Sequence, residues 1–291
     1  MTPPLPPLIQ TKKKLSDLST FGIGGPAEYF AEVSSEQEMA DVLVFAKKNQ
    51  LRHMVLGKGS NCLFDDQGYS GLIILNKITF LEGLDSGQVK AGSGYSFSLL
   101  GSQTARKGLA GLEFASGIPG SVGGAVVMNA GANGKETCEA LKSVDFMNME
   151  GMITTFQRDK LSYGYRSSPF QKMKGAVTAA EFTLIKSLKA RQKQIEIIDY
   201  RKKTQPLKEK SAGCVFRNPD NGHSGALIEQ CGLKGKKIGG AMVSEQHANF
   251  IVNTGGATAS DALKLIRLIQ EQVRLQTGRQ LKMEVRYIPY E

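Results

Sequence analysis

Cysteine is scarce in this sequence, with four among 291 residues, and no two of them form a C-x-x-C pair. Because Cys62, Cys138, Cys214 and Cys231 lie far apart, their spacing argues against a zinc ribbon or another metal site. Isolated cysteines are typical of reduced thiols in the cytoplasm. We therefore expect a cytoplasmic protein without a metal centre.

Long apolar runs are also lacking, and no stretch approaches the roughly 20 apolar residues of a membrane-spanning helix. The first residues, Met1–Lys14, are rich in proline and then basic, without the apolar core of a secretory signal. We interpret them as a frayed arm rather than a targeting peptide. A composition with 41% apolar and 22% charged residues is typical of a soluble globular protein.

Two common nucleotide-binding patterns are missing, the G-x-x-x-x-G-K-[ST] loop of many ATPases and the G-x-G-x-x-G turn of Rossmann domains. The sequence instead has two other glycine-rich stretches, Gly117–Gly131 (GIPGSVGGAVVMNAG) and Val55–Asn61 (VLGKGSN). Glycines let a backbone turn tightly and present successive N–H groups to an anion. The alternative is a plain glycine-rich bend between two strands.

The second stretch lies between the apolar segments Met54–Leu56 and Cys62–Phe64, which fits a turn between two strands. Two separate anion-binding turns suit a ligand with a diphosphate and a long body, and FAD is the natural candidate. We expect the cofactor to be held by Gly57, Lys58, Gly59, Ser60, Asn61, Gly117, Ile118, Pro119, Gly120, Ser121, Gly123, Gly124, Asn129 and Gly131.

The formal net charge of +10 has two functional interpretations, attraction of anionic small molecules and binding of nucleic acid. Simple solubility is a third. The densest cluster of basic residues, Lys186–Lys210, is typical of a charged helix that ends before Pro206. Because no nucleic-acid-binding motif accompanies these charges, we expect no nucleic-acid partner.

The order of expected elements favours an α+β fold over a regular alternation of strands and helices. Boundaries between parts of the chain are expected near Ile78–Asp85 and Lys203–Leu207, and Ser211–Pro219 is expected to be a polar turn. Besides the charged helix, helices are predicted over Glu36–Asn49, Ser98–Lys107, Ala226–Cys231 and Ser260–Thr277. Strands are predicted over Leu72–Leu75, Val89–Ala91, Val144–Met149, Ile153–Phe156, Ala176–Ser187, Ala248–Asn253 and Leu281–Ile288.

Several sequence blocks, in the same order, resemble the UDP-N-acetylenolpyruvoylglucosamine reductase (MurB) family of flavoproteins. The blocks are Leu18–Phe30, Leu56–Leu63, Gly117–Gly131, Tyr163–Ser168, Ser211–Pro219, Leu227–Asn253 and Glu284–Arg286. The resemblance implies an FAD-binding module of the vanillyl-alcohol-oxidase (PCMH) type in two parts, residues 1–80 and 81–205. A C-terminal α+β domain for the UDP-sugar, residues 206–291, would follow, with its last strand returning toward the site.

The same resemblance implies an activity. Family members reduce UDP-N-acetylglucosamine enolpyruvate to UDP-N-acetylmuramate for peptidoglycan synthesis, with non-covalent FAD and with NADPH as reductant. We expect the chain to work as a monomer, although no motif in the sequence specifies the oligomeric state. Between Arg166 and Cys214 we find no long insertion of the kind that carries a substrate-capping loop in longer members. The chain therefore resembles the shorter, second type, and no lid residue can be named from it.

Hydride addition to an enolpyruvyl ether places negative charge on the α-carbon and the adjoining carboxylate, so a cation and a proton donor are needed. By resemblance, Arg166 supplies the cation, Glu284 a second polar group and Cys214 the proton. Serine stands at this last position in many family members, and a thiol, with a pKa of about 8.5, is a competent donor. A buried structural cysteine is the alternative.

Other candidate site residues also have structural alternatives. Arg166 would be an ordinary surface arginine without the motif around it, and Glu284 pairs as easily with Lys282 or Arg286. His247 is expected to be structural. By resemblance, the substrate is bound by Tyr165, Asn218, Lys234 and Arg286.

Two rival functions of other classes remain open. The first is an FAD-dependent oxidase or dehydrogenase of a small hydroxy acid on the same scaffold. The second is a non-catalytic module that binds nucleotides or nucleic acid. A flavoprotein is yellow as purified, so colour distinguishes a flavoenzyme from the binding module. Oxidation of the reduced flavin by the enolpyruvyl substrate distinguishes the reductase from the oxidase.

Overall fold

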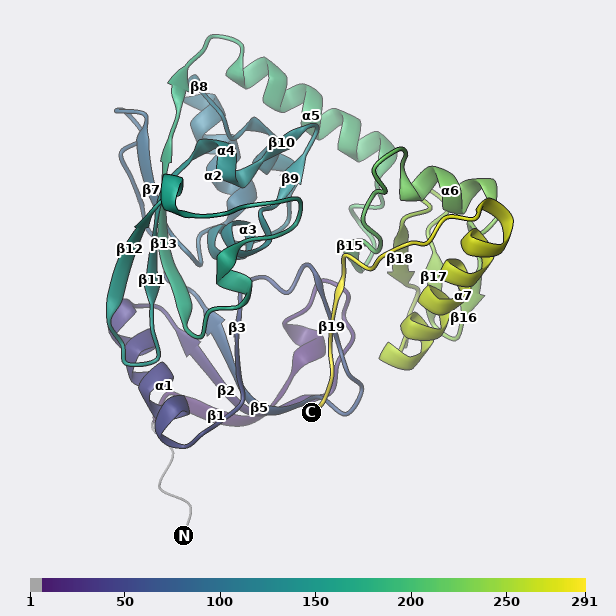
Figure 1. Cartoon of the computed structure of the whole chain (residues 1–291), viewed down its shortest axis with the longest axis horizontal. Coiled ribbons are helices and arrows are strands. Elements are labelled where there is room, and N and C mark those ends of the chain that lie inside the picture. The colour runs from purple at the N-terminus through teal and green to yellow at the C-terminus, as the bar shows by residue number, and fades with distance from the viewer. Residues whose placement is uncertain (1–6) are drawn as a thin grey trace. The chain divides into compact units, whose positions relative to one another are not determined.

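A computed structural model describes residues 7–291 of the chain, which divide into two compact units (Figure 1). The first comprises the residues up to Thr11, Tyr29–Lys58 and Gly71–Tyr200. The second comprises Lys12–Glu28, Gly59–Ser70 and Arg201–Glu291. The chain therefore passes between the units several times.

The five-stranded sheet of the first unit has the order β12-β11-β13-β7-β6, and all its neighbouring strands are antiparallel. The strands are β6 (Leu81–Glu82), β7 (Gln88–Gly92), β11 (Leu141–Met147), β12 (Ile153–Gln157) and β13 (Ala176–Thr183). Their apolar side chains pack with α2 (Phe97–Arg106), α3 (Val122–Met128) and α4 (Thr137–Ala140) in one buried core. Two short pairs, β8 (Leu109–Ala110) with β14 (Ile185–Lys186) and β9 (Gly131–Ala132) with β10 (Lys135–Glu136), flank this core.

A four-stranded sheet has the order β1-β2-β5-β3, formed by β1 (Ile9–Lys14), β2 (Pro26–Val33), β3 (His53–Leu56) and β5 (Tyr69–Asn76). Helix α1 (Glu36–Lys48) packs against it through Met39, Val42, Leu43 and Ala46, which recur at the spacing of one helical face. The hydroxyl of Ser35 accepts the amide of Glu38 and fixes the start of this helix.

The second unit contains a four-stranded antiparallel sheet of order β15-β18-β17-β16. Its elements are β15 (Ser211–Cys214), α6 (Ser224–Gln230), β16 (Lys237–Ile238), β17 (Ala241–Val243), β18 (Phe250–Asn253) and α7 (Ala259–Thr277). The last strand of the chain, β19 (Arg286–Ile288), pairs in parallel with β4 (Cys62–Phe64). Helix α5 (Ala190–Thr204) carries the chain into this unit (Figure 1).

The structure confirms the expected helices in α1, α2, α5, α6 and α7 within a few residues, and the hairpin of β11 and β12. Three expectations are wrong. Ile9–Lys14 is a strand rather than a frayed arm, whereas Met1–Pro6 lie outside the described residues. Ser211–Cys214 is a strand rather than a turn, and the final strand begins only at Arg286. Within residues 7–291, no helix combines the length and the apolar character needed to cross a membrane.

Helix α7 depends on a carboxylate from a distant part of its unit. Asp66 accepts hydrogen bonds from the amides of Ala259 at 2.7 Å and Ser260 at 3.1 Å, which have no partner within the helix. The apolar face of α7 is buried, so its first turn must be held in register with the core.

We expect Asp66→Ala to lower the free energy of unfolding by about 1–2 kcal/mol, because two helix-terminal amides lose their acceptor. Asp220→Ala, at an exposed carboxylate, should change it by less than about 0.5 kcal/mol. Denaturant titration of both variants measures the difference. Equal stability of the two would show that Asp66 does not hold the helix.

Candidate functional site

The two predicted glycine turns of the first unit lie against each other. Strand β3 ends at Leu56, and a Cβ atom added to Gly57 would lie 2.2 Å from the hydroxyl of Ser121. The segment that contains Ser121 is fixed by hydrogen bonds from the Phe97 amide to the Gly120 carbonyl (3.0 Å) and from the Val122 amide to the Tyr95 carbonyl (2.9 Å). A side chain at position 57 would therefore have to displace the Ser121 hydroxyl, which accepts the Gly124 amide at 3.2 Å.

A cation lies beside these turns. The ammonium of Lys58 donates a hydrogen bond to the hydroxyl of Ser96 at 2.8 Å, and Ser96 also caps α2. Burial, and secondarily the charge of Lys77, lower the pKa of Lys58. Within residues 7–291, the amides of Gly120 and Ser121 donate to no protein acceptor. Free amides, a cation and a backbone without side chains together fit the phosphates of a dinucleotide such as FAD.

The remainder of the second glycine stretch, Gly59–Asn61, belongs to the second unit. Gly59 has a φ of +59°, and a Cβ atom there would lie 2.2 Å from the Leu18 carbonyl. The Asn61 side chain donates to the Glu284 carbonyl at 3.2 Å, and the Arg286 amide donates to the Asn61 carbonyl at 3.0 Å. The turn predicted to hold the cofactor is thus hydrogen-bonded directly to the segment that carries Glu284.

Arg166 lies at the corner of a tight turn in the first unit. Gly164 and Ser167 exchange both backbone hydrogen bonds, so Tyr165 and Arg166 form the two corners. Arg166 has a φ of +54°, a left-handed conformation that is uncommon for residues other than glycine. Its guanidinium donates to the Gly131 carbonyl at 3.0 Å and lies over the Tyr165 ring. A strained conformation held by several contacts is typical of a functional position.

Asn129 supports this turn from within. Its side chain is fully buried and donates to the Gly164 carbonyl at 3.0 Å and to Glu136 at 2.8 Å, and it accepts the Cys138 amide. Its own φ of +43° ends helix α3. The structure therefore gives Asn129 a supporting role beneath Arg166, and its contact with a cofactor stays a prediction.

Cys214 and Glu284 lie in the second unit, joined through Val215. The carbonyl of Val215 accepts hydrogen bonds from the Glu284 amide at 2.7 Å and the Val285 amide at 3.3 Å. Gly213, with a φ of +76°, allows the bulge in β15 that precedes Cys214. The two residues that sequence reasoning assigned to proton donation and carboxylate binding are therefore neighbours, although 70 positions separate them in the chain.

Arg201 lies in the stretch that the charge pattern predicts to be a charged helix, and nothing in that pattern distinguishes it. Its Nε atom is buried and has no hydrogen-bond partner within the described residues. Burial lowers the pKa of its guanidinium, and a smaller electrostatic interaction with Cys214 raises it. The charge pattern of α5 gave no sign of this, because Arg201 resembles its exposed neighbours Lys202 and Lys203 in sequence.

The predicted substrate-binding residues are distributed over both units. Tyr165, 45% exposed, lies in the first unit. In the second unit, Asn218 accepts the Ser224 amide at 3.1 Å, Lys234 forms a salt bridge with Glu229 at 2.6 Å, and Arg286 is exposed. A lysine already paired with a carboxylate needs rearrangement to bind a diphosphate, so Lys234 is the least prepared of the four.

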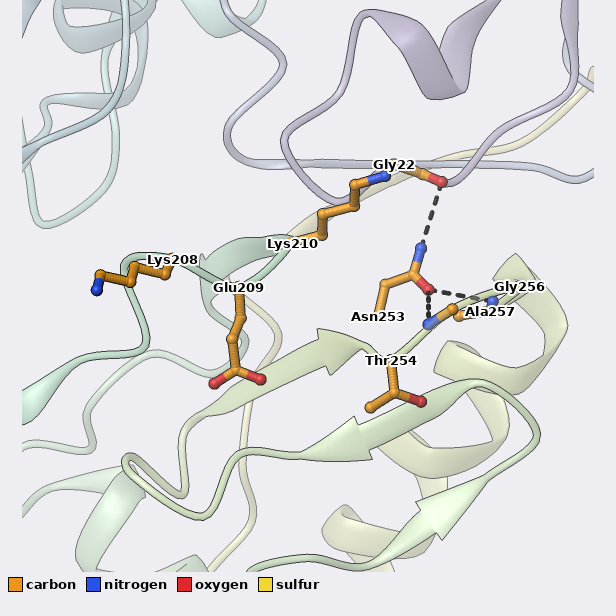
Figure 2. A pocket seen from close by; sticks show the side chains of 9 residues that line it. Gly22, Lys208, Glu209, Lys210, Asn253, Thr254, Gly256 and Ala257 are labelled. Carbon is orange, nitrogen blue, oxygen red and sulfur yellow. Dashed lines mark hydrogen bonds between the residues drawn. The ribbon is translucent and has the colours of Figure 1, made fainter.

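A separate pocket of about 410 Å³ opens in the second unit at the ends of β15 and β18 (Figure 2). Its lining residues are Gly22, Lys208, Glu209, Lys210, Asn253, Thr254, Gly255, Gly256 and Ala257, and none of the predicted site residues is among them. Asn253 holds one wall, because its side chain donates to the Phe21 carbonyl and accepts the amides of Gly255 and Ala257. The pocket is thus a feature apart from the candidate site.

Comparison with known proteins decides the family. The sequence model of the FAD binding domain matches residues 27–157, and that of the UDP-N-acetylenolpyruvoylglucosamine reductase C-terminal domain matches residues 205–288. UDP-N-acetylenolpyruvoylglucosamine reductase of Protochlamydia amoebophila is 60% identical over 99% of this chain and 96% of its own. The chain belongs to the UDP-N-acetylenolpyruvoylglucosamine reductase family.

Two further comparisons agree with this family. The reductase of Chlamydia trachomatis serovar A is 46% identical over 100% of this chain and 99% of its own length. The crystal structure of the reductase from Thermus caldophilus matches with a TM-score of 0.82 at 36% identity, and covers 97% of this chain and 99% of that one. The family resemblance, the α+β fold with an FAD-binding module and FAD as the cofactor are thereby confirmed.

The contact between the glycine turns can be tested by a single methyl group. We expect Gly57→Ala to weaken FAD binding at least about tenfold, about 1.4 kcal/mol, because the added Cβ must displace the Ser121 hydroxyl. Gly134→Ala, in a turn of the same unit with open space around it, should cost some stability because Gly134 has a φ of +73°, but should leave FAD affinity unchanged. Fluorescence titration of the apoproteins with FAD measures both, and unaltered affinity in Gly57→Ala would contradict the cradle.

Proposed function

We infer that the chain is an NADPH-dependent flavoenzyme that reduces UDP-N-acetylglucosamine enolpyruvate to UDP-N-acetylmuramate. The observation that carries this conclusion is membership of the reductase family over nearly the whole chain, with a flavin-binding domain in its first half. The overall reaction balances as one enolpyruvyl ether, one NADPH and one proton giving the lactyl ether and NADP⁺. FAD, when bound, would supply the hydride chemistry that links NADPH to the substrate.

The residues of the chain are proposed to manage charge and protons around that hydride transfer. When the β-carbon receives hydride, negative charge develops on the α-carbon and the substrate carboxylate. We assign Arg166 to pair with this carboxylate, since its guanidinium is held in place by Gly131 and Tyr165. Glu284 is assigned as the second polar group and Cys214 as the donor whose thiol proton reaches the α-carbon.

The cofactor is proposed to be held by the two glycine turns. These turns comprise Gly57–Asn61 and the residues named above within Gly117–Gly131. The UDP part of the substrate is assigned to Tyr165, Asn218, Lys234 and Arg286. Each of these assignments rests on the family motif together with the contacts described above.

The organisation of the protein is a further part of the proposal. We assign residues 1–80 and 81–205 to the FAD-binding module and residues 206–291 to the substrate domain. The enzyme is proposed to act as a monomer in the cytoplasm, where its nucleotide-linked substrate and NADPH are made, and to bind no nucleic acid. Sedimentation of the purified protein tests the monomer.

The function is tested by colour and by flavin redox state. The protein as purified should be yellow, lose its flavin absorbance on addition of NADPH without oxygen, and regain it when UDP-N-acetylglucosamine enolpyruvate is added. Protein that is yellow but is not reoxidised by this compound would indicate an oxidase or dehydrogenase of another substrate. Colourless protein with no affinity for FAD would sink the flavoenzyme assignment altogether.

The role of Cys214 has a separate test. We expect Cys214→Ser to retain measurable reduction, because a hydroxyl also carries a proton, and Cys214→Ala to slow flavin reoxidation by the substrate at least about a hundredfold, as expected for loss of an acid catalyst. Reduction of the flavin by NADPH should be unchanged in both. Stopped-flow absorbance resolves the two half-reactions, and normal reoxidation in Cys214→Ala would remove this thiol from the mechanism.

A further inference from the structure

The backbone that follows Cys214 lacks an ordinary strand partner on one edge. Strands β15 and β18 pair up to Cys214, which faces Phe250 in the register. The Val215 amide still donates to the Asn249 carbonyl at 2.8 Å. Beyond that point the partner chain turns away, since the Phe250 amide closes back onto the His247 carbonyl at 2.9 Å. Phe216 therefore has no backbone group opposite it on this edge.

The side chain of Asn249 fills the missing position. Its amide nitrogen donates to the Phe216 carbonyl at 2.8 Å, and its oxygen accepts the Phe216 amide at 2.9 Å. An antiparallel pair exchanges the same two hydrogen bonds between backbone groups, so the carboxamide acts as one added peptide unit. Asn249 is 3% exposed and Phe216 1%, and water therefore cannot replace these bonds.

The other edge of the same segment faces the chain around Glu284. The Glu284 amide donates to the Val215 carbonyl, the Arg217 amide donates to the Lys282 carbonyl at 2.9 Å, and Phe216 pairs with Met283. The segment from Val215 to Arg217 is thus a short central strand between Asn249 and the Glu284 segment. Without the Asn249 side chain, one of its two edges is unsupported at Phe216, two residues after Cys214.

We propose that Asn249 is a positioning residue that fixes the Cys214 thiol for proton delivery to the substrate. The inference rests on the proposed function, because it assumes that Cys214 donates the proton. In this step the sulfur–hydrogen bond breaks as a carbon–hydrogen bond forms at the α-carbon, and the thiolate then recovers a proton from solvent. Proton transfer of this kind loses efficiency steeply when the donor moves by as little as about 1 Å.

The groups around Cys214 come from three elements. Arg201 on α5 interacts with it electrostatically, and Glu284 is joined to it through Val215. His247 lies against the ring of Phe250, with which Cys214 pairs, and its Nδ1 accepts the Asn249 amide at 3.2 Å. Asn249 is uncharged, so its replacement moves the thiol among these groups without adding or removing a charge.

Asn253, at the end of the strand β18 that begins directly after Asn249, offers a matched control. Like Asn249, it is an asparagine whose side chain both donates hydrogen bonds to backbone carbonyls and accepts them from backbone amides. It supports the pocket wall shown in Figure 2 rather than the chain around Cys214. Asn253→Ala therefore measures what the loss of a structural asparagine costs in this unit, apart from any effect on the thiol.

The test compares Asn249→Ala and Asn253→Ala as flavin-loaded enzymes in stopped flow. In Asn249→Ala, we expect reoxidation of the reduced flavin by UDP-N-acetylglucosamine enolpyruvate to slow by about tenfold or more, with a larger solvent deuterium isotope effect. Flavin reduction by NADPH should stay within about twofold. Asn253→Ala should keep both rates within about twofold while losing thermal stability.

A second readout does not depend on the reaction. The rate at which iodoacetamide alkylates Cys214, followed by mass spectrometry of the peptide that contains it, should change in Asn249→Ala and not in Asn253→Ala. If Asn249→Ala does not fold, Asn249→Ser replaces it, since a hydroxyl cannot bridge both the amide and the carbonyl of Phe216.

The possible results distinguish the role of Cys214 as proton donor from the role of Asn249 in positioning it. Slow reoxidation in both Cys214→Ala and Asn249→Ala supports the inference. Slow reoxidation in Cys214→Ala with a normal rate in Asn249→Ala overturns the positioning role and leaves the proposed function intact. Equal slowing of both half-reactions in Asn249→Ala and Asn253→Ala also overturns it, because the effect is then a general loss of structure. A normal rate of flavin reoxidation in Cys214→Ala would show that this thiol is not the proton donor, and the positioning role of Asn249 would then be overturned as well.

Discussion

The carbonyl of Val215, which receives the amides of Glu284 and Val285, is the contact on which the candidate site depends. It joins two segments that are far apart in the chain and sets the spacing between a thiol and a carboxylate. The Val215 amide is bound in turn by Asn249. Because both backbone groups of Val215 are occupied, the chain next to Cys214 and the chain at Glu284 cannot shift apart without breaking a buried hydrogen bond, which costs about 1–3 kcal/mol.

The glycine turns apply a second constraint, which is steric rather than bonding. At Gly57 and Gly59 the space that a Cβ atom would occupy is already filled by Ser121 and by the Leu18 backbone. Close approach of backbones exposes amide groups, and Lys58 adds a positive charge. In the proposed cofactor site, a dinucleotide phosphate would therefore be met by main-chain dipoles and the Lys58 cation, an arrangement that requires little reorganisation of side chains on binding.

Much of the fold follows from the local sequence. The spacing of Met39, Val42, Leu43 and Ala46 predicts α1, and the apolar face of α7 predicts the longest helix. Helix α3 was not predicted, because its glycines weaken helix propensity and only tertiary contacts compensate. The Gly123 amide donates to the Ser93 carbonyl at 2.8 Å, and a Cβ on Gly123 would lie 2.9 Å from the Ser93 side chain.

In the candidate site, too, some features follow from the local sequence and others depend on contacts between distant residues. Family motifs direct attention to Arg166, Cys214 and Glu284. Asn249 lies within the family block Leu227–Asn253, but the sequence assigns it no role, since its partner Phe216 is 33 positions away. Arg201 was hidden among exposed basic residues for a similar reason. Strand β15 was mistaken for a turn because Gly213, at positive φ, has the local signature of a turn while it forms a bulge within a strand.

The left-handed backbone of Arg166 has a consequence for the engineering of this enzyme. Glycine adopts a φ of +54° without the penalty that arginine incurs, so a library selected only for thermal tolerance would favour glycine at position 166. Such a selection would discard the guanidinium that Gly131 and Tyr165 hold in place. The backbone preference at this residue is therefore opposed to the role that we propose for its guanidinium, and stabilising substitutions should be sought elsewhere in the chain.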